Sequence, residues 1–348
     1  MMTVDISVLY DYHNRGLLKC QSNHTGRLRI WNYSERVQFS GALWDSVTTM
    51  CRALITDTEG NVVARSFPKF FNIGQLEEDD GEGDGFVVQA KMDGSLGVIF
   101  WDSVEDAWTL TSRGSFTSEQ AVRGQRILNT MYDISGFDKD LAYSVEIIYP
   151  ENRIVVDYGD DVKLVFLAAF YKDGTEAFPD VRGSGMPVVE TYDYTDYKTI
   201  RAHDWTNCEG FVVRFRSSGK RIKIKFENYV RLHGLQASLS NITVWQKWST
   251  GMPIADAIEG VPDELFDWFT GLWNGFDEAK RTITTQLEAT YKELYAAAPD
   301  RKEFAKAVLG RGVLGRGSKL LFALYAGKSI SSSVVDMVKP SVRRYAYE

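Results

Sequence analysis

Lys91 lies between two alternating sequence patterns and has the chemistry of a nucleophile. It begins the run 91–97, which separates the apolar alternating stretches 86–90 and 98–101. Asp93-Gly94 is a frequent hairpin turn, so we expect the two stretches to pair as neighbouring strands. Such a turn does not require a lysine. Lys91 is therefore either a solvated loop residue or part of a ligand site.

Carboxylates and further lysines occur in three other strand-like segments. Glu146 and Glu209 each lie in one of them, and Lys223 and Lys225 alternate with apolar residues in the third. The alternation places both lysines on one face of a strand. Taken singly, these residues have simpler interpretations, namely a salt bridge at the rim of a sheet for Glu146 and a solvated strand face for the two lysines.

Together, the lysines and carboxylates predict covalent nucleotidyl transfer. A lysine close to other cations is pushed towards its neutral, nucleophilic form. Neighbouring cations suit a polyphosphate, and carboxylates suit a Mg²⁺ ion bound to that phosphate. We therefore expect Lys91 to attack the α-phosphate of a nucleoside triphosphate and to release pyrophosphate. The sequence contains no GxxxxGK[ST] run, which speaks against a P-loop fold.

The segments that carry these residues are typical of an α+β domain. Ser118 is placed to cap a helix over residues 118–131. The proline-fixed segment 66–72 carries three phenylalanines, and the acidic, glycine-rich segment 77–85 is expected to be a solvated connection. Apolar patterns bounded by turn residues predict strands over residues 28–33, 50–55, 62–65, 86–90, 98–101, 108–112, 141–148, 152–158, 164–170, 209–215 and 221–226, the last two forming a hairpin.

The pattern becomes helical after about residue 245. One helix is expected to begin at Pro262, a second follows the apolar spacing from Ile283 to Tyr295, a third is capped by Asp300, and a short one covers residues 331–338. We therefore predict an adenylyltransferase domain over residues 1–245, built of antiparallel sheets with flanking helices. A small all-helical domain is expected over residues 246–348.

Composition limits the classes of protein that remain. Contents of 44% apolar and 25% charged residues are ordinary for a globular chain. The net charge of -7 means that any contact with nucleic acid must come from a local basic surface. Cys20, Cys51 and Cys208 form no CxxC pair, which argues against a disulfide framework or a zinc site. Without a signal peptide or a run of 18 apolar residues, the protein is expected to be cytoplasmic.

The chemical residues, in their order and spacing, resemble the covalent nucleotidyltransferase superfamily. Within it they most resemble the RNA ligase 1 family of T-even-type bacteriophages, the tRNA-repair ligases, over about residues 40–245. The matching motifs are 91–95 (KxDGS), 112–115 with Arg113 where the family usually has lysine, 144–146 followed by 152–155, 209–212, and 223–225 followed by Tyr229. Arg52 and the block 65–72 resemble a segment special to this family.

The resemblance implies a role for each matching residue. Lys91 would be the nucleophile that becomes adenylated, and Lys223 and Lys225 would hold the α-phosphate and drive out pyrophosphate. Glu146 would bind the ribose or a metal ion, and Glu209 would bind a metal ion. The implied nucleotide-binding residues are Arg52, Lys69, Phe71, Asp93, Gly94, Arg113, Glu146, Gly210 and Tyr229.

The resemblance also implies an ATP-dependent RNA ligase that uses Mg²⁺, for which Mn²⁺ can substitute. Its partners would be RNA ends, in single-stranded RNA or in a broken tRNA anticodon loop, with no protein partner and no membrane. The helical domain occupies the place of the family's RNA-specificity domain. Its basic segment 306–319 would contact RNA or be a solvated loop, and its four tryptophans would stack bases or, more simply, form a core; they are Trp245, Trp248, Trp268 and Trp273.

Two alternatives stay open at this point. One is a DNA ligase or a capping-type nucleotidyltransferase on the same scaffold. The other is a non-catalytic protein that binds RNA ends. The second alternative would require a lost motif residue, and all five of the central ones are present, namely Lys91, Glu146, Glu209, Lys223 and Lys225.

Overall fold

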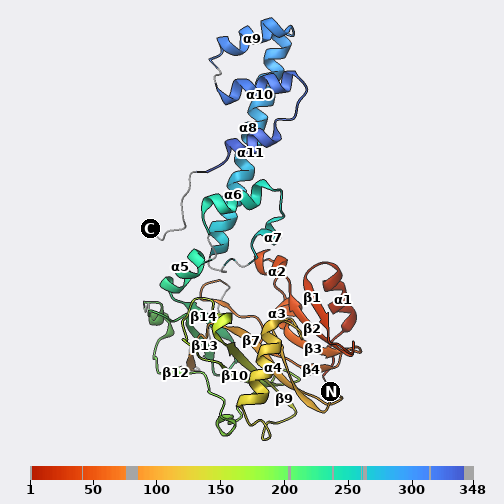
Figure 1. Ribbon diagram of the computed structural model, residues 1–348, viewed down its shortest axis with the longest axis vertical. Coiled ribbons are helices and arrows are strands. Elements are labelled where there is room, and N and C mark those ends of the chain that lie inside the picture. The colour runs from red at the N-terminus through yellow and green to blue at the C-terminus, as the bar shows by residue number, and fades with distance from the viewer. Residues whose placement is uncertain are drawn as a thin grey trace. The chain divides into compact units, whose positions relative to one another are not determined.

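The structure is a computed structural model in which the chain forms two compact units, Met1–His233 and Gly234–Glu348 (Figure 1). It describes residues 2–40, 42–75, 85–202, 205–236, 239–259, 261, 265–312 and 315–340. The division lies earlier than the predicted boundary at residue 245. The reason is that helix α6 (Asn241–Ser249) packs against α8 (Phe266–Ala297) of the second unit, with Trp248 Nε1 donating to Asp277 Oδ1 at 2.9 Å.

The described residues of the first unit form three β-sheets, which confirms the α+β class. The strands of the first sheet follow the chain, in the order β1 (Leu18–Ser22), β2 (Leu28–Tyr33), β3 (Arg52–Asp57) and β4 (Val62–Ala64). The second has the order β11 (Glu176–Ala177), β10 (Lys163–Tyr171), β9 (Leu141–Ile148), β7 (Ser95–Asp102) and β8 (Ala107–Ser112). The third has the order β12 (Thr191–Tyr192), β6 (Phe86–Ala90), β13 (Gly210–Phe215), β14 (Arg221–Lys225) and β5 (Phe71–Asn72). All neighbours pair antiparallel except β14 and β5, which pair parallel.

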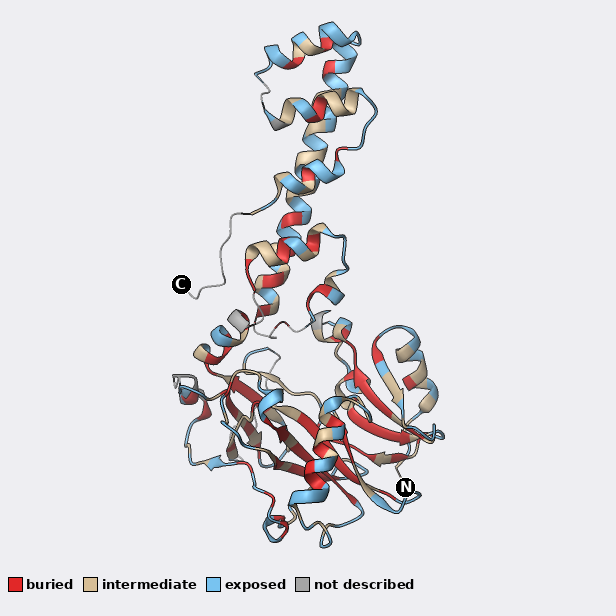
Figure 2. Ribbon diagram, in the orientation of Figure 1, coloured by how far each residue is buried: buried red, intermediate tan, exposed pale blue. Residues whose placement is uncertain are grey.

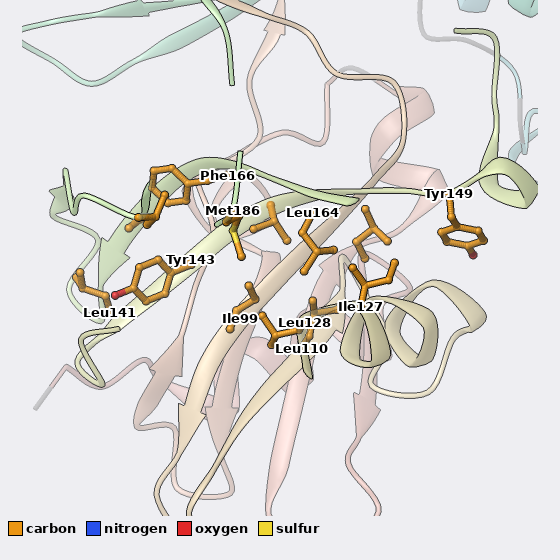
Figure 3. Packing of buried hydrophobic residues seen from close by; sticks show 14 residues of the cluster. Ile99, Leu110, Ile127, Leu128, Leu141, Tyr143, Tyr149, Leu164, Phe166 and Met186 are labelled. Carbon is orange, nitrogen blue, oxygen red and sulfur yellow. The ribbon is translucent and has the colours of Figure 1, made fainter. Parts of the chain in front are cut away.

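Helix α4 (Glu119–Met131) covers the second sheet, and its start confirms the predicted cap. Ser118 Oγ accepts from the Ala121 amide at 3.2 Å, which satisfies one of the free amides of the first turn. The apolar side of α4 packs on β8, so Ile127 meets Leu110 in a core cluster that Figure 3 shows from close by. The other helical segments of this unit are α1 (Ile6–Asn14), α2 (Glu35–Ser40), α3 (Ser46–Met50), α5 (Glu227–Gln236) and the short 3₁₀ turns Pro150–Asn152, Arg182–Ser184 and Tyr197–Ala202.

The predicted hairpin around Lys91 is wrong. Strand β6 pairs with β12 and β13 of the third sheet, whereas β7 pairs with β8 and β9 of the second. Residues 91–94 are therefore a crossover between two sheets. An alternating pattern fixes which face of a strand is buried, but it does not identify the partner strand. The predicted hairpin of β13 and β14 is confirmed, with Val212 opposite Lys223.

The predicted strand over residues 152–158 is also wrong. This segment is irregular and follows the 3₁₀ turn Pro150–Asn152. The amides of Val155 and Val156 donate to the Asp93 carboxylate, each at 2.8 Å, and so are not used in a strand ladder. The expected solvated connection at 77–85 lies almost wholly outside the described residues.

The described part of the second unit consists of helices and their connections, as predicted. They are α6, α7 (Ile254–Ala257), α8, α9 (Arg301–Gly310), α10 (Arg316–Tyr325) and α11 (Ser331–Met337). Asp300 caps α9, while the expected start at Pro262 lies outside the described residues. Three of the tryptophans, Trp245, Trp248 and Trp273, are buried, which confirms that they belong to the core. Figure 2 shows that buried residues recur along the helices of this unit. Among the described residues, no helix has the length and apolar character needed to span a bilayer.

Candidate active site

A cavity of about 500 Å³ in the first unit collects residues from all three sheets. One part of its wall is apolar and includes Ala90, Leu167 and Val189; another part is polar and includes Arg52 and Arg113. An apolar wall beside cations suits a flat base linked to phosphates. The lining residues are Lys19, Asn32, Glu35, Arg52, Phe67, Phe70, Gln89, Ala90, Lys91, Met92, Gly94, Ser95, Leu96, Ser112, Arg113, Gly114, Ser115, Gln120, Glu146, Leu167, Val189, Val212 and Arg221.

Lys91 enters this cavity from a crossover whose backbone is held at successive points. Its amide donates to the Gly210 carbonyl oxygen at 2.9 Å, which fixes it to the third sheet. The Gly94 amide donates to Glu146 Oε1 at 3.1 Å, which fixes the other end to β9 of the second sheet. The lysine is therefore presented by a rigid connection between two sheets.

The Lys91 ammonium group pairs with Glu209. Lys91 Nζ lies 2.8 Å from Glu209 Oε1, and Lys225 Nζ lies 3.5 Å from the same oxygen. Glu209 is only 4% exposed, so its charge is balanced by two lysines rather than by water. Position 210 must be glycine, because a Cβ there would lie 2.0 Å from the Ile224 carbonyl oxygen and its φ is +145°. The close backbone approach expected at Gly210 is thus made by strand β14.

Glu146 faces the cavity from β9 and has an unusual acidity. Burial raises the pKa of its carboxyl to about 8, and the charges of Glu209 and Asp93 add to this increase. Lys91 and Arg52 act in the opposite direction but do not overcome the burial. In the free protein, Glu146 therefore keeps its proton at neutral pH, and a cation placed beside it would favour the ionised form.

Asp93 and Tyr229 hold the crossover in place rather than line the cavity. Besides the two amides at 155 and 156, Asp93 accepts from Tyr229 Oη at 2.6 Å, and it is 3% exposed. The Asp93 amide in turn donates to Tyr158 Oη at 2.9 Å. These side chains position the loop that carries Lys91, and their contact with a nucleotide stays a prediction.

Two arginines of the predicted set point their charge into the cavity. Arg52 stacks on the Phe67 ring at 4.6 Å, and its Nη1 is buried without a hydrogen-bond partner among the described residues. Arg113 Nη1 donates to Tyr33 Oη at 3.2 Å. Burial lowers the pKa of the Arg52 guanidinium, but an arginine remains charged at physiological pH. A buried guanidinium nitrogen without a hydrogen-bond partner, such as Arg52 Nη1, is a ready donor to a phosphate group.

Lys69 and Phe71 do not line the Lys91 cavity. They line a second cavity, of about 700 Å³, in the same unit. The Lys69 ammonium group lies 5.4 to 5.5 Å from the ring centres of Tyr33, Trp44 and Phe71. Phe67, Phe70 and Arg221 line both cavities and form the wall between them.

Strand β14 carries a cation that the sequence analysis missed. Arg221 lines the cavity, whereas Lys223 is buried at 7% exposure and neither Lys223 nor Lys225 is among its described lining residues. The interpretation of the two lysines as a solvated face is therefore wrong. Arg221 shares their strand face because it lies two residues before Lys223, and this spacing was a usable signal. Lys19, Glu35 and Gln120 were also missed, because they come from β1, α2 and α4, which no motif marks.

The site offers few protein ligands to a divalent cation. No group of three Asp, Glu, His or Cys side chains suited to a metal occurs among the described residues. Glu146 and Glu209 supply carboxylates at the Lys91 crossover, where Glu146 accepts from the Gly94 amide and Glu209 pairs with the Lys91 ammonium group. Mg²⁺ is commonly bound by one or two carboxylates together with substrate phosphates, so these residues fit an ion that arrives with a polyphosphate.

In sequence, this chain is similar to known RNA ligases. The profile of the RNA ligase family matches residues 50–230. The chain is 27% identical over 227 residues to a putative bifunctional polynucleotide kinase/RNA ligase of Autographa californica nuclear polyhedrosis virus. That alignment covers 57% of this chain and 32% of the relative, so the chain spans about a third of the relative's length.

Solved structures give weaker likenesses. An archaeal ATP-dependent RNA ligase is 15% identical, with a TM-score of 0.48 and coverage of 94% of this chain and 96% of that chain. A mutant of the Naegleria gruberi RNA ligase with AMP and Mn is 18% identical, with a TM-score of 0.38 and coverage of 61% of this chain and 75% of that chain.

Proposed function

The chain belongs to the RNA ligase family, and we propose that it is an ATP-dependent RNA ligase that works through a lysine-adenylate at Lys91. The observation that carries this proposal is the position of Lys91. Its side chain extends from a fixed crossover into a cavity with an apolar wall on one side and the guanidinium groups of Arg52 and Arg113 on the other.

The first step forms a bond between Lys91 Nζ and the α-phosphorus of ATP. The ammonium group must first lose a proton, which passes to solvent, while Glu209 Oε1, at 2.8 Å, holds the amine in position. The bond between the α-phosphorus and its bridging oxygen then breaks, and pyrophosphate leaves with the electron pair. Arg52 and Arg113 are placed to neutralise the phosphate charge that builds up. Positioning and charge neutralisation account for most of the lowering of such a barrier.

In the second step, an oxygen of the RNA 5′-phosphate attacks the phosphorus of the bound AMP. The bond between phosphorus and nitrogen breaks, and Lys91 recovers its proton. In the third step, a 3′-hydroxyl oxygen attacks the 5′-phosphorus of the activated RNA and loses its proton to solvent. The bond between that phosphorus and the oxygen it shares with AMP breaks, and AMP leaves with the electron pair. A Mg²⁺ ion, or Mn²⁺ in its place, would neutralise phosphate oxygens, with Glu146 and Glu209 as the carboxylates that would hold it.

Incubation with α-labelled ATP and Mg²⁺ tests the first step. We expect one acid-labile label per chain, located on Lys91 and absent from Lys91→Ala. Lys172→Ala, which changes an exposed lysine that lines neither cavity, should label normally. An unlabelled wild type, or equal labelling of Lys91→Ala, would refute the proposal. Labelled GTP and DNA ends, used in parallel, separate a capping-type enzyme and a DNA ligase from an RNA ligase.

We also propose that the natural substrate is a broken tRNA and that the second unit selects it. The support is that this unit follows the catalytic motifs in the chain and carries basic residues. Two of these are already paired, Arg311 with Glu293 and Lys306 with Glu303. Sealing of a nicked anticodon stem-loop should exceed sealing of a linear strand of the same sequence. Equal rates on both would contradict this choice of substrate.

A further inference from the structure

The second cavity combines aromatic rings with cationic side chains. It lies wholly within the first unit, and the turn between β13 and β14 contributes to its lining. Phe70 and Phe71 are partly exposed in its wall, and Phe71 is braced edge-on by Trp44, with ring centres 5.2 Å apart. Accessible rings that are held in position offer flat faces on which a base can stack.

The charge of this cavity is opposite to that of the whole chain. Its lining includes five cationic residues, Lys69, Arg214, Arg216, Lys220 and Arg221. Its only acidic lining residue among those described is Glu176, which gives a lining charge of five minus one, or +4. The chain as a whole carries a net charge of -7, so this concentration of cations is a local feature. It favours an occupant with several negative charges.

Glu176 keeps two of the cations in place rather than neutralising the cavity. It pairs with Arg214 at 2.6 Å and with Arg221, and all three side chains are largely buried. The carboxylate is thereby engaged within the wall. Arg216 and Lys220, in contrast, are exposed in the turn between β13 and β14 and extend the positive surface to the mouth of the cavity.

The two cavities share a wall formed by Phe67, Phe70 and Arg221. We propose that the second cavity binds a nucleotide of single-stranded RNA next to the end that is being joined. The base would stack on Phe70 or Phe71, and the neighbouring phosphates would contact Arg216 and Lys220. This inference rests on the proposed function for the identity of the polyanion. Basic grooves with stacking aromatics are the usual design for binding single strands.

The double variant Arg216→Glu/Lys220→Glu tests the proposal, because both residues line the second cavity and neither lines the first. The matched control is Arg126→Glu/Arg182→Glu, which reverses the charge of two exposed arginines that line neither cavity. Three quantities are measured for wild type and both variants: the dissociation constant for a fluorescent single-stranded RNA at several salt concentrations, the KM for ATP in self-adenylation, and the rate of RNA sealing.

We expect the test variant to bind RNA about tenfold more weakly at 0.1 M salt and to seal RNA correspondingly slowly. Its slope of log affinity against log salt should fall by about 1.4, since each lost phosphate contact removes about 0.7 for a single strand. Self-adenylation should match the wild type, which also shows that the variant folds. The control should match the wild type throughout.

Unchanged RNA affinity in the test variant, or an equal loss in the control, would overturn the proposal. An increased KM for ATP with unchanged RNA affinity would also overturn it, by assigning the cavity to the triphosphate. A wild type that binds RNA but does not become adenylated would refute the proposed function while leaving the RNA-binding cavity supported by its own measurement.

Discussion

Replacing Glu146 by glutamine should stabilise the first unit at neutral pH. In the unfolded chain the carboxyl titrates near pH 4.5, whereas in the folded protein burial raises its pKa to about 8. Between these values the unfolded chain releases a proton that the folded chain retains. Stability is therefore lost as the pH rises through this window, and the loss is complete above the folded pKa. Glutamine cannot ionise, so the variant does not have this loss, and its side-chain oxygen can still accept from the Gly94 amide.

The two pKa values give the size of the effect. The wild-type penalty is about 1 kcal/mol at pH 5 and about 3 kcal/mol at pH 7 by the linkage relation. The free energy of unfolding of the variant, relative to wild type, should therefore increase by about 2 kcal/mol from pH 5 to pH 7.

Urea unfolding followed by tryptophan fluorescence, with a chelator present to remove divalent cations, measures this difference at both pH values. The other titrating groups are common to the two proteins and cancel in the comparison. Self-adenylation should nevertheless fall in the variant, because it lacks the carboxylate proposed to hold the metal ion. A difference in unfolding free energy that is the same at pH 5 and pH 7 would show that Glu146 is not held in its protonated form, and would refute the reasoning.

Three substitutions and one chemical modification test other parts of the first unit. Glu176→Ala should lower the free energy of unfolding by about 3 to 5 kcal/mol in a urea titration, because it leaves two largely buried arginines unpaired; equal stability would contradict the buried ion pairs. Gly210→Ala should abolish soluble expression or cost more than about 3 kcal/mol of stability, since its Cβ would overlap the Ile224 carbonyl oxygen. Asp93→Ala should lower the melting temperature strongly, because three hydrogen-bond donors lose their acceptor. Each buried donor left unsatisfied costs about 1 to 3 kcal/mol of stability, so a small shift in melting temperature would argue against the anchoring role. Burial raises the pKa of the Cys20 thiol to about 11, so its alkylation, followed by mass spectrometry, should be slow at pH 8 and rise about tenfold per pH unit up to pH 10.

The sequence predicted the parts of the fold that depend on local patterns. The strand at 141–148, the hairpin of β13 and β14, and the helix capped by Ser118 all have the expected bounds to within a few residues. In each case, period-two alternation or a capping side chain is a short-range property of the chain. Pairing between distant strands is not, which is why Lys91 was expected in a hairpin and was found on a crossover.

For the same reason, the sequence predicted some residues of the candidate site but not the tertiary contacts that set their roles. Motif spacing identified Lys91 and Glu146, which line the first cavity, and Glu209, which pairs with Lys91. Motifs did not reveal that Asp93 acts through backbone amides of a segment 62 residues away. Nor did they separate Lys69 from Arg52, which lie one in each cavity. Side-chain roles that depend on tertiary contacts need the folded chain, because residues far apart in sequence supply the partners.

The hydrogen bonds around the crossover limit how the protein can move during a reaction. The amide of Lys91 is held by Gly210, and the chain just after it is held through Asp93 and Gly94. A segment fixed at each of these points cannot swing the lysine from one binding partner to another. Successive substrates must therefore be exchanged in front of a lysine whose backbone is stationary. The amine itself moves only by rotation of its four-carbon side chain. Any large motion between the steps has to come from other parts of the chain or from the RNA itself.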